Sequence, residues 1–448
     1  MSSEWISFTD LLSTIVDNRG RTCPVEAKGT PLIATNCINS SNLYPSYDTT
    51  RFVSDETYRT WFRGHPNPGD ILFVCKGSPG RTNWVPDPVD FCIAQDMVSV
   101  RPDHSKVYPK YLFAALRSSI IQNQIDNMHV GTMIPHFKKG DFGKLKIPVP
   151  DRSAQEVVGD FYFVVSERIN LLRETNATLE SIAQALFKSW FVDFDPVRAK
   201  MEGRSPEGMD EATAELFPDS LEESELGLVP KGWCLLPFGQ LLSHTIGGDW
   251  GGEAPDEKND TRVAIVRGTD IPDLQCGTNA RVPIRYTTKK KLANRKIQAD
   301  DIVIEVSGGS KDQPTGRSLQ FNEGLLELFD CPVEPASFCR LFRPISKAVA
   351  PILGQHLIYI YDKGKTWEYQ NQSTGIANFQ TTHFLETELV VVPSQEILTK
   401  FENVVRPIIE RINLSQAREL ASLRDTLLPR LISGQLRLPV CEDSFEVV

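Results

Sequence analysis

The stretch "FTDLLSTIV" at residues 8–16 decides the fold, because a close copy, "FGQLLSHTI", stands at residues 238–246. After each copy comes a short apolar run behind an acidic residue, "GDILFV" from Gly69 and "DDIVIEV" from Asp300. Each run leads into a Gly- and Ser-rich loop that contains Gly-Arg, "CKGSPGRTNW" in the first half and "VSGGSKDQPTGRS" in the second. Similarity at a fixed spacing predicts a structural unit that occurs twice.

Three more features repeat in the same order. A Phe-Cys pair occurs at Phe91-Cys92 and again at Phe338-Cys339. The segment "GTMIPHFKKGDFGKLKIPVP" corresponds to "TGIANFQTTHFLETELVVVP", and each half ends in a segment that contains "ERIN". Two unrelated domains that merely use common turns would not share six features in one order. We therefore predict an internal duplication.

The closing segment of each half has a heptad pattern. In the first half the apolar positions are Val158, Val165, Leu172, Leu179 and Leu186. In the second they are Phe401, Val405, Ile408 and Ile412, followed by Leu420, Leu423, Leu427 and Leu431. A narrow apolar stripe suits one helix packing on one other helix. We predict two long antiparallel helices, the first starting with a capping box of Ser153 and Glu156 and ending before Pro196.

The segments before the helices hold short β-rich runs divided by Gly and Pro turns, which is typical of small sheets. The predicted fold class is α+β, with two α/β-to-mainly-β domains separated by the two helices and related by a pseudo-two-fold duplication. The predicted boundaries are a first domain at 1–150, a first helix at 151–195, an acidic linker at 196–230, a second domain at 231–393, a second helix at 394–434 and a tail at 435–448.

The net charge of −10 is concentrated in two places. Residues 201–230 hold nine acidic residues and one arginine, and the tail after Pro439 holds three more acids. The rest of the chain is close to neutral, so local basic patches remain compatible with the composition. The nine cysteines form no Cys-x-x-Cys pair, which favours reduced thiols and a cytoplasmic location. No apolar run approaches the roughly 20 residues of a membrane span.

Motifs for chemistry are missing. The loop from Gly309 to Arg317 lacks the spacing and the lysine of a phosphate-binding loop, and no dinucleotide-binding Gly-x-Gly-x-x-Gly follows a strand. Ser307 stands where a nuclease Glu-x-Lys motif needs its lysine, and the histidines lack metal-binding spacing. We predict no catalytic residue and no metal site, and hence no enzyme activity for the chain by itself.

The Gly-rich loops instead carry side chains that suit DNA recognition. Arg and Lys can bridge guanine O6 and N7, and Asn and Gln can bridge adenine N6 and N7. Solvated turns would contain similar residues, but their similar placement in both halves favours DNA contact. The candidate residues in the first half are Lys76, Ser78, Arg81, Asn83, His136, Lys138 and Lys139, and those in the second are Ser307, Lys311, Gln313, Arg317, Asn378 and Gln380.

Three segments carry a family resemblance: "SIAQALFKSWFVDFDPVRAKMEG" (181–203), "LGLVPKGW" (226–233) and "LASLRDTLLPRLISGQL" (420–436). They resemble the conserved regions of the specificity subunit of type I restriction-modification enzymes, a resemblance that extends over nearly the whole chain. It implies two target recognition domains that bind a bipartite, asymmetric site in double-stranded DNA. It also implies two modification subunits that bind S-adenosylmethionine and methylate adenine, and restriction subunits that use ATP and Mg. Those cofactors belong to the partners, so none is expected in this chain, which would work in a prokaryotic cytoplasm.

The resemblance suggests a role for the large apolar residues near the end of the first helix. They exceed what a two-helix seam can bury, and exposed apolar patches of that size usually mark an interface. We expect them to dock one modification subunit and a leucine-rich segment of the second helix to dock the other. The predicted partner-binding residues are Leu186, Phe187, Trp190, Phe191 and Phe194, together with Leu427, Leu428 and Leu431. An alternative function is a non-enzymatic coiled-coil scaffold with two peptide-binding domains.

Overall fold

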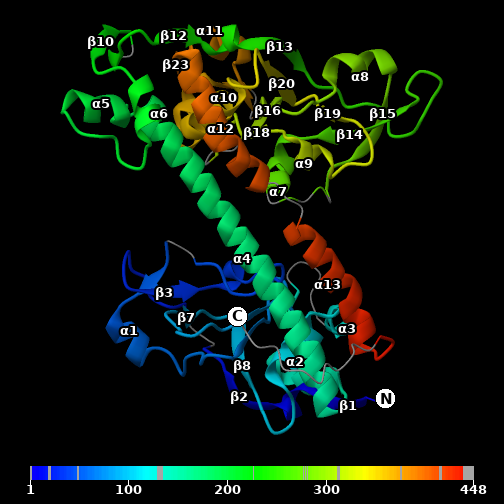
Figure 1. Cartoon of the computed structure of the whole chain (residues 1–448). Coiled ribbons are helices and arrows are strands. Elements are labelled where there is room, and N and C mark those ends of the chain that lie inside the picture. The colour runs from blue at the N-terminus through cyan, green and yellow to red at the C-terminus, as the bar shows by residue number, and fades with distance from the viewer. Residues whose placement is uncertain are drawn as a thin grey trace. The chain divides into compact units, whose positions relative to one another are not determined.

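The structure is a computed structural model, and it describes residues 3–18, 22–47, 50–128, 135–225, 227–275, 277, 279, 281–309, 313–373, 376–412 and 416–436. The chain divides into two compact units. Unit 1 comprises Met1–Leu172 and Ala417–Val448, and unit 2 comprises Arg173–Gln416. The long helix α4 (Arg152–Phe191) contributes its first half to unit 1 and its second half to unit 2 (Figure 1).

Unit 1 is built on a four-stranded antiparallel sheet with the strand order β2-β8-β5-β6. A second sheet, β4-β3-β7, pairs β3 and β7 in parallel, and β1 pairs with β9. Its elements before α4 are β1 (Glu4–Ser7), η1 (Phe8–Leu11), β2 (Leu12–Val16), β3 (Thr30–Ile33), η2 (Thr35–Cys37), β4 (Phe52–Val53), α1 (Asp55–Thr60), β5 (Ile71–Val74), β6 (Thr82–Trp84), β7 (Cys92–Ile93), β8 (Met97–Pro102), α2 (Pro109–Arg117), α3 (Ser119–Met128), η3 (Lys139–Lys144) and β9 (Lys146–Val149).

Unit 2 repeats this topology. Its four-stranded sheet has the order β13-β20-β16-β18, its second sheet is β15-β14-β19 with β14 and β19 parallel, and β12 pairs with β23. The elements from α5 to α12 are α5 (Asp195–Met201), α6 (Glu211–Leu216), β10 (Leu221–Ser224), β11 (Gly227–Pro230), β12 (Cys234–Pro237), η4 (Phe238–Leu241), β13 (Leu242–Gly247), β14 (Thr261–Val266), η5 (Gly268–Asp270), α7 (Ile271–Gln275), β15 (Ile284–Thr287), α8 (Lys289–Arg295), β16 (Ile302–Glu305), β17 (Ser307–Gly309), β18 (Ser318–Gln320), α9 (Glu323–Leu326), β19 (Val333–Pro335), β20 (Cys339–Pro344), α10 (Ala350–Asp362), η6 (Lys365–Tyr369), β21 (Gln370–Ser373), β22 (Ile376–Phe379), α11 (Thr381–Thr387), β23 (Leu389–Val392) and α12 (Gln395–Ile412).

The repetition extends to individual buried contacts. Asp70, at the start of β5, forms an ion pair with Arg101 on β8 at 2.8 Å, and Asp301 at the start of β16 pairs with Arg343 on β20 at 2.7 Å. All but about 1% of each aspartate side chain is buried. Both pairs cross the same two central strands of their sheets. Together with the shared strand order, they confirm the predicted α+β fold and its internal duplication.

One of the six repeated features was aligned wrongly. The predicted equivalence of Phe91-Cys92 and Phe338-Cys339 fails because Cys92 lies on β7, in the sheet with a parallel strand pair. Cys339 begins β20, in the four-stranded sheet. The structural counterpart of β7 is β19, where Val333 pairs with Ala264 as Cys92 pairs with Leu32. Both Phe-Cys pairs enter buried strands, and that shared environment explains the local similarity.

The helices differ in detail from the prediction. The N-terminus of α4 is capped by Asp151, whose carboxylate accepts a hydrogen bond from the Ala154 backbone N–H at 2.9 Å, so the capping box of Ser153 and Glu156 was wrong. The second helical segment consists of α12 and α13 (Gln416–Ile432), and residues 413–415 between them lie outside the described residues.

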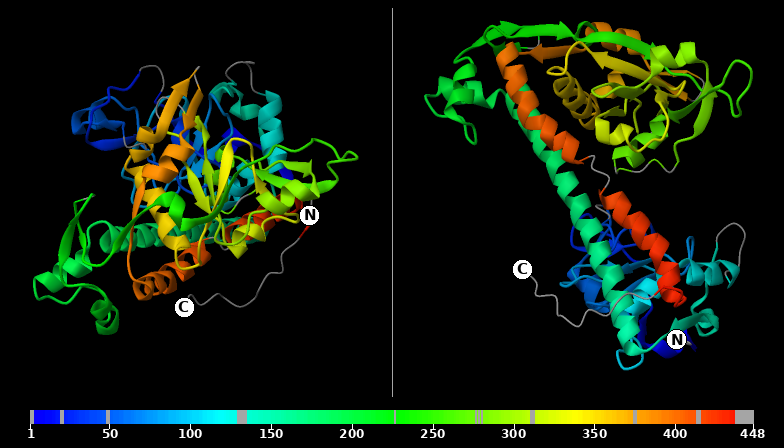
Figure 2. Two further views of the ribbon diagram at one scale, coloured as in Figure 1. Left: turned by 90° about the horizontal axis from the view of Figure 1, so that it is seen from above. Right: turned by 45° about the vertical axis from the view of Figure 1, so that its right-hand side comes forward.

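Helix α4 is antiparallel to a different helix in each unit. In unit 1, Ser166 accepts a hydrogen bond from Arg424 on α13 at 3.1 Å, and Val158 packs in a cluster with Leu431. In unit 2, the Asn176 amide donates to the Ile412 carbonyl on α12 at 2.8 Å, and Trp190 contacts Phe401 with ring centroids 5.6 Å apart. The right-hand view in Figure 2 shows α12 and α13 running alongside α4.

The segment predicted as an acidic linker, 196–230, is folded in unit 2. It holds most of α5, the short helix α6 and the hairpin of β10 and β11. Phe217 and Val229 are buried in the core of this unit, and the Asp210 side chain caps α6 by accepting a hydrogen bond from the Thr213 N–H. Among the described residues, no helix combines the length and the apolar character that crossing a membrane requires.

Candidate nucleic-acid interface

In unit 1 the two loops predicted to contact DNA lie against each other. The first follows β5 and the second precedes η3. An isolated antiparallel bridge joins Lys76 to His136, the Gly77 N–H donates to the Pro135 carbonyl at 2.9 Å, and the Phe137 N–H donates to the Cys75 carbonyl at 2.8 Å. Gly77 has a φ of +89°, a left-handed conformation that favours glycine. The backbone therefore forms one composite surface from segments about 60 residues apart.

The lysine side chains on this surface differ in whether they already form ion pairs. Lys139 forms an ion pair with the nearly buried Asp17 at 3.2 Å, and the ammonium of Lys76 is 4.0 Å from the Asp96 carboxylate. Ser78 and Lys138 are exposed. Because an unpaired exposed lysine gives up less on meeting a phosphate than one already in an ion pair, Lys138 is the strongest cationic candidate in this loop pair.

Asn83 was wrongly predicted to read bases. Its side chain is fully buried, and its amide donates to the carbonyls of Asn39, Asn42 and Leu43, at 2.7 Å for the shortest bond. Its oxygen accepts from the Asn39 N–H at 2.9 Å. Arg81 is also partly committed, because it donates to the Thr35 carbonyl at 3.1 Å and its Nε atom is buried. Both residues hold neighbouring loops in place.

The corresponding surface of unit 2 forms on the small sheet β17-β22-β21. Ser307 on β17 donates a hydrogen bond to the Asn378 side chain on β22 at 2.8 Å. The amide of Gln313 donates to the Tyr361 hydroxyl at 3.2 Å, and Gln380, immediately after β22, is exposed. These candidate residues therefore belong to adjacent segments. Lys311 lies outside the described residues.

Arg317 was wrongly predicted to lie free for DNA contact. Its guanidinium donates two hydrogen bonds to Glu305, at 2.9 and 2.7 Å, and the Glu305 side chain is only 2% exposed. These hydrogen bonds raise the pKa of Arg317. A carboxylate in this position is costly without its cation, so the pair is structural. The sequence contained a signal for it, an acidic residue within the apolar run "DIVIEV".

The aromatic residues near the end of α4 do not form an exposed patch, so the premise of the predicted docking site was wrong. Phe187, Trp190, Phe191 and Phe194 are each at least 94% buried, and Leu186 packs against the same core cluster. Their partners come from within unit 2, among them Phe217, Trp233 and Phe401. The cluster exceeds what a two-helix seam can bury because the folded 196–230 segment and α12 cover it as well.

The second predicted docking segment is also largely internal. Leu428 and Leu431 on α13 are buried in the core of unit 1, and Leu427 packs against the edge of that core. Arg424, one turn earlier, is 5% exposed and lies over the Tyr162 ring. These leucines attach α13 to the core of unit 1, which leaves them little surface for a partner.

A basic segment that the sequence analysis did not single out is α8. "KKKLANRK" contains five cations in eight residues, and the Thr288 side chain caps the helix by accepting a hydrogen bond from the Lys291 N–H. Lys291 pairs with Asp249 at 2.7 Å, while Lys290 is exposed. The counterpart of α8 in unit 1 is α1, which follows β4 as α8 follows β15 and begins with Asp55 and Glu56. The two units thus differ in charge at equivalent positions.

Beneath α8, Glu334 on β19 is fully buried, and neither of its carboxylate oxygens has a hydrogen-bond partner. Burial raises its pKa to about 7, the charge of Asp249 adds to the rise, and Arg295 and Lys291 offset part of it. A carboxyl whose pKa rises on folding binds more protons in the native state than in the unfolded state. Stability therefore falls as the pH rises from about 4.5 to 7 and is level above that range.

We expect Glu334→Gln to remove this pH dependence. Relative to the parent chain, the variant should gain up to about 3 kcal/mol of unfolding free energy at pH 8 and little at pH 4.5, because one pKa unit is worth about 1.4 kcal/mol. Urea denaturation at both pH values, followed by hydrogen exchange of β14 and β19, measures the effect. Glu327→Gln, at an exposed position, is the matched control. An equal change at both pH values would contradict the assignment.

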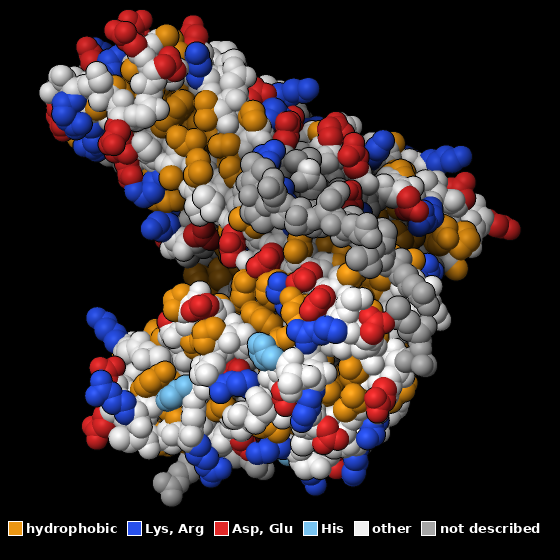
Figure 3. Space-filling view, turned by 60° about the horizontal axis from the view of Figure 1, so that its bottom comes forward, with side chains coloured by type: hydrophobic (Ala, Val, Ile, Leu, Met, Phe, Trp, Pro, Cys, Tyr) orange, Lys and Arg blue, Asp and Glu red, His pale blue; other side chains and the backbone are white. Residues whose placement is uncertain are grey.

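Charges elsewhere on the surface are mixed. Figure 3 shows Lys and Arg side chains interspersed with Asp and Glu over the face in view. Within the part of the chain that the structure describes, His, Cys, Asp and Glu side chains do not gather in threes that could hold a metal ion. The candidate interface is therefore a set of uncharged polar side chains with a few cations.

Comparison with known proteins shows which family the chain resembles. The family model described as "Type I restriction modification DNA specificity domain" matches residues 23–181, which cover most of unit 1. The chain is also 26% identical over 425 residues to the type I restriction enzyme HindI specificity subunit of Haemophilus influenzae, covering 82% of this chain and 86% of that protein. These matches, like the sequence motifs, make the chain similar to type I restriction specificity subunits over most of its length.

A second specificity subunit, that of the type I restriction enzyme MjaIX from Methanocaldococcus jannaschii, is 23% identical over 360 residues, covering 77% of this chain and 74% of that one. Among solved structures, the S subunit of the type I restriction-modification system of M. genitalium is 17% identical, with a TM-score of 0.49 and 96% of each chain covered. The sequence relatives span both units of this chain, and the predicted resemblance is confirmed.

Proposed function

We propose that this specificity subunit recognises a bipartite, asymmetric DNA site, with one half-site bound by each unit. The proposal rests on one observation: the two units have the same sheet framework, but their loops carry different side chains. The ion pairs Asp70–Arg101 and Asp301–Arg343 occupy equivalent strands. The exposed candidates differ, however: they include Ser78 and Lys138 in unit 1, and Gln313 and Asn378 in unit 2. A common framework with different side chains suits two different short sequences.

The subunit acts in this proposal as the recognition component and catalyses nothing itself. Modification subunits, two for each chain, would bind S-adenosylmethionine and methylate adenine, and restriction subunits would cleave DNA with ATP and Mg. The family assignment supports partnership with restriction-modification subunits and with DNA. Because its substrate is cellular DNA, we propose that the complex works in the prokaryotic cytoplasm.

The most direct experiment maps methyladenine across a host genome with and without the specificity subunit. We expect one asymmetric, two-part motif to be methylated only when the subunit is present. A chimaera in which unit 2 comes from a relative should change one half of the motif and leave the other half unchanged. A coiled-coil scaffold with peptide-binding domains would instead leave the methylation pattern independent of both changes.

Individual contacts can be tested in the complex assembled with its modification subunits. Asn378→Ala should relax specificity at one position and cost about 1–3 kcal/mol on the cognate site, because it removes a bidentate adenine contact. Lys138→Ala should weaken binding to all sequences and reduce the slope of log affinity against log salt by about 1. Binding titrations at several salt concentrations measure both effects.

Lys146→Ala is a matched control, since this exposed lysine lies on β9, outside the candidate loops, and should change neither quantity. If Asn378→Ala lost as much affinity for random DNA as for cognate DNA, Asn378 would contact the DNA backbone and not the bases. If the slope of log affinity against log salt did not change in Lys138→Ala, Lys138 would not contact a DNA phosphate.

A further inference from the structure

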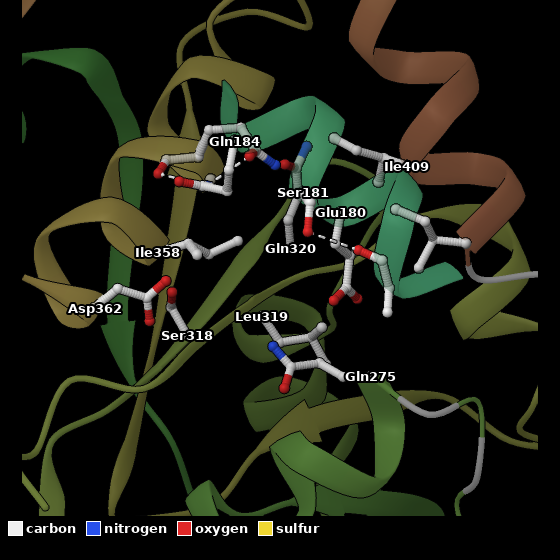
Figure 4. A pocket seen from close by; sticks show the side chains of 14 residues that line it. Glu180, Ser181, Gln184, Gln275, Ser318, Leu319, Gln320, Ile358, Asp362 and Ile409 are labelled. Atoms are coloured by element: carbon white, nitrogen blue, oxygen red, sulfur yellow. Dashed lines mark hydrogen bonds between the residues drawn. The ribbon is translucent and has the colours of Figure 1, made fainter. Parts of the chain in front are cut away.

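Unit 2 contains a cavity of about 430 Å³ that the proposed DNA recognition does not use. Helix α4 contributes a face of residues three to four apart, from Ala177 to Gln184, and α10, β18, α7 and α12 supply the other walls (Figure 4). Volumes of this size are typical of small-molecule sites.

The charges on the lining have one sign. Glu180 and Asp362 are acidic, and among the described residues that line the cavity there is no Lys, Arg or His. Figure 4 shows the two carboxylates on different sides of the cavity, with Asp362 beside Ser318. Both residues are exposed, so a ligand can reach their carboxylates from solvent, and partial desolvation raises the pKa of each carboxyl group. A bound cation would offset that desolvation cost.

Unsatisfied acceptors point to the same kind of ligand. The side-chain oxygen of Gln320 is buried without a hydrogen-bond partner, and Ser318 is 92% buried with its hydroxyl directed into the cavity (Figure 4). The Gln184 amide already donates to Gln355, at 2.6 Å to the side-chain oxygen. A donor-rich ligand without acceptors would complete these groups, and an ammonium ion has three donors and no acceptor.

The remaining walls are apolar. Leu319, Ile358, Ile409 and Ile412 supply the larger apolar side chains of the lining. A small inorganic cation would leave these side chains in contact with water, whereas a chain of methylene groups would cover them. The lining therefore combines two acidic groups on different sides with several apolar side chains.

We propose that this cavity binds an aliphatic diamine or polyamine. Its ammonium groups contact Glu180 and Asp362, an inner N–H group donates to the Ser318 hydroxyl, and its methylene chain lies on the isoleucines. The inference is independent of DNA recognition, since the lining shares no residue with the candidate interface.

Spermidine is the test ligand, titrated calorimetrically into the full-length chain in the absence of DNA. We expect one site per chain and at least a tenfold loss of affinity in the double variant Glu180→Gln, Asp362→Asn. Those changes are nearly isosteric, and thermal unfolding without spermidine checks that the variant folds. Glu386→Gln, at an exposed acid on α11, should bind spermidine as the parent chain does.

Three comparisons distinguish specific binding from general charge attraction. A diol of matching length should not bind, Mg²⁺ at equal ionic strength should not displace spermidine, and spermidine should raise the thermal unfolding temperature of the parent chain but not of the double variant. Unchanged affinity in the double variant, or full displacement by Mg²⁺, would overturn the proposal. Since lysine side chains carry the same ammonium group, displacement of spermidine by the modification subunit would identify a protein source for the cation.

Discussion

Arg317→Ala is expected to lower the unfolding free energy of unit 2 by about 3–5 kcal/mol, because it leaves the buried carboxylate of Glu305 without its cation. The same loop was predicted to supply a base contact through this arginine, which would have given a loss of specificity in a stable protein. Urea denaturation of the full-length chain, with hydrogen exchange followed in β16 and β18, measures the effect in the right unit.

Two variants make the result interpretable. Glu305→Gln combined with Arg317→Met removes both charges together and should destabilise unit 2 less than Arg317→Ala alone. Gln313→Ala, in the same loop but exposed, should change stability by no more than about 0.5 kcal/mol. If Arg317→Ala retained full stability and relaxed DNA specificity, the arginine would have to leave Glu305 and contact DNA.

The second large effect is expected for Trp190→Ala. The indole is 6% exposed and packs on Phe217, with ring centroids 5.1 Å apart, and on Phe401, at 5.6 Å. Truncation of a buried tryptophan leaves a cavity, for which the usual cost is about 3–5 kcal/mol. We expect a lower urea midpoint and faster hydrogen exchange in α12 and in the segment around Phe217.

Leu171→Ala provides the comparison, because this side chain of α4 is 51% exposed and its removal should cost at most about 0.5 kcal/mol. Capture of the modification subunit should fall for Trp190→Ala only in proportion to the unfolding of unit 2. Loss of capture by a variant with parental stability would restore the docking role first inferred for this cluster.

The duplication was predictable because it depends on chain-local patterns. The copies "FTDLLSTIV" and "FGQLLSHTI" each form a short 3-10 helix followed by a strand, and the acidic residue before each apolar run starts the central strand of its sheet. Hydrophobic spacing also indicated the long helix. Its cap was missed because the Asp151 carboxylate, and not the Ser153 hydroxyl, accepts the hydrogen bond from the Ala154 N–H in the first turn.

The candidate site was predicted less well, for a physical reason. A polar residue in a Gly-rich loop has the same chemistry whether it faces a base or its own backbone. Asn83 satisfies all its hydrogen bonds with the chain around Asn39, about 44 residues away in sequence, and such a partner has no local signature. Likewise, the aromatic residues of α4 could not be seen to be covered until the fold placed Trp233 and Phe401 over them.

The repeated ion pairs have an evolutionary consequence. Each pair, Asp70 with Arg101 and Asp301 with Arg343, is complete within its own unit and touches none of the exposed loop candidates. After the ancestral gene doubled, either copy could therefore accumulate substitutions in its loops without compensating changes in the other. A lineage can therefore change the sequence of one DNA half-site in one step while the other half-site is still recognised.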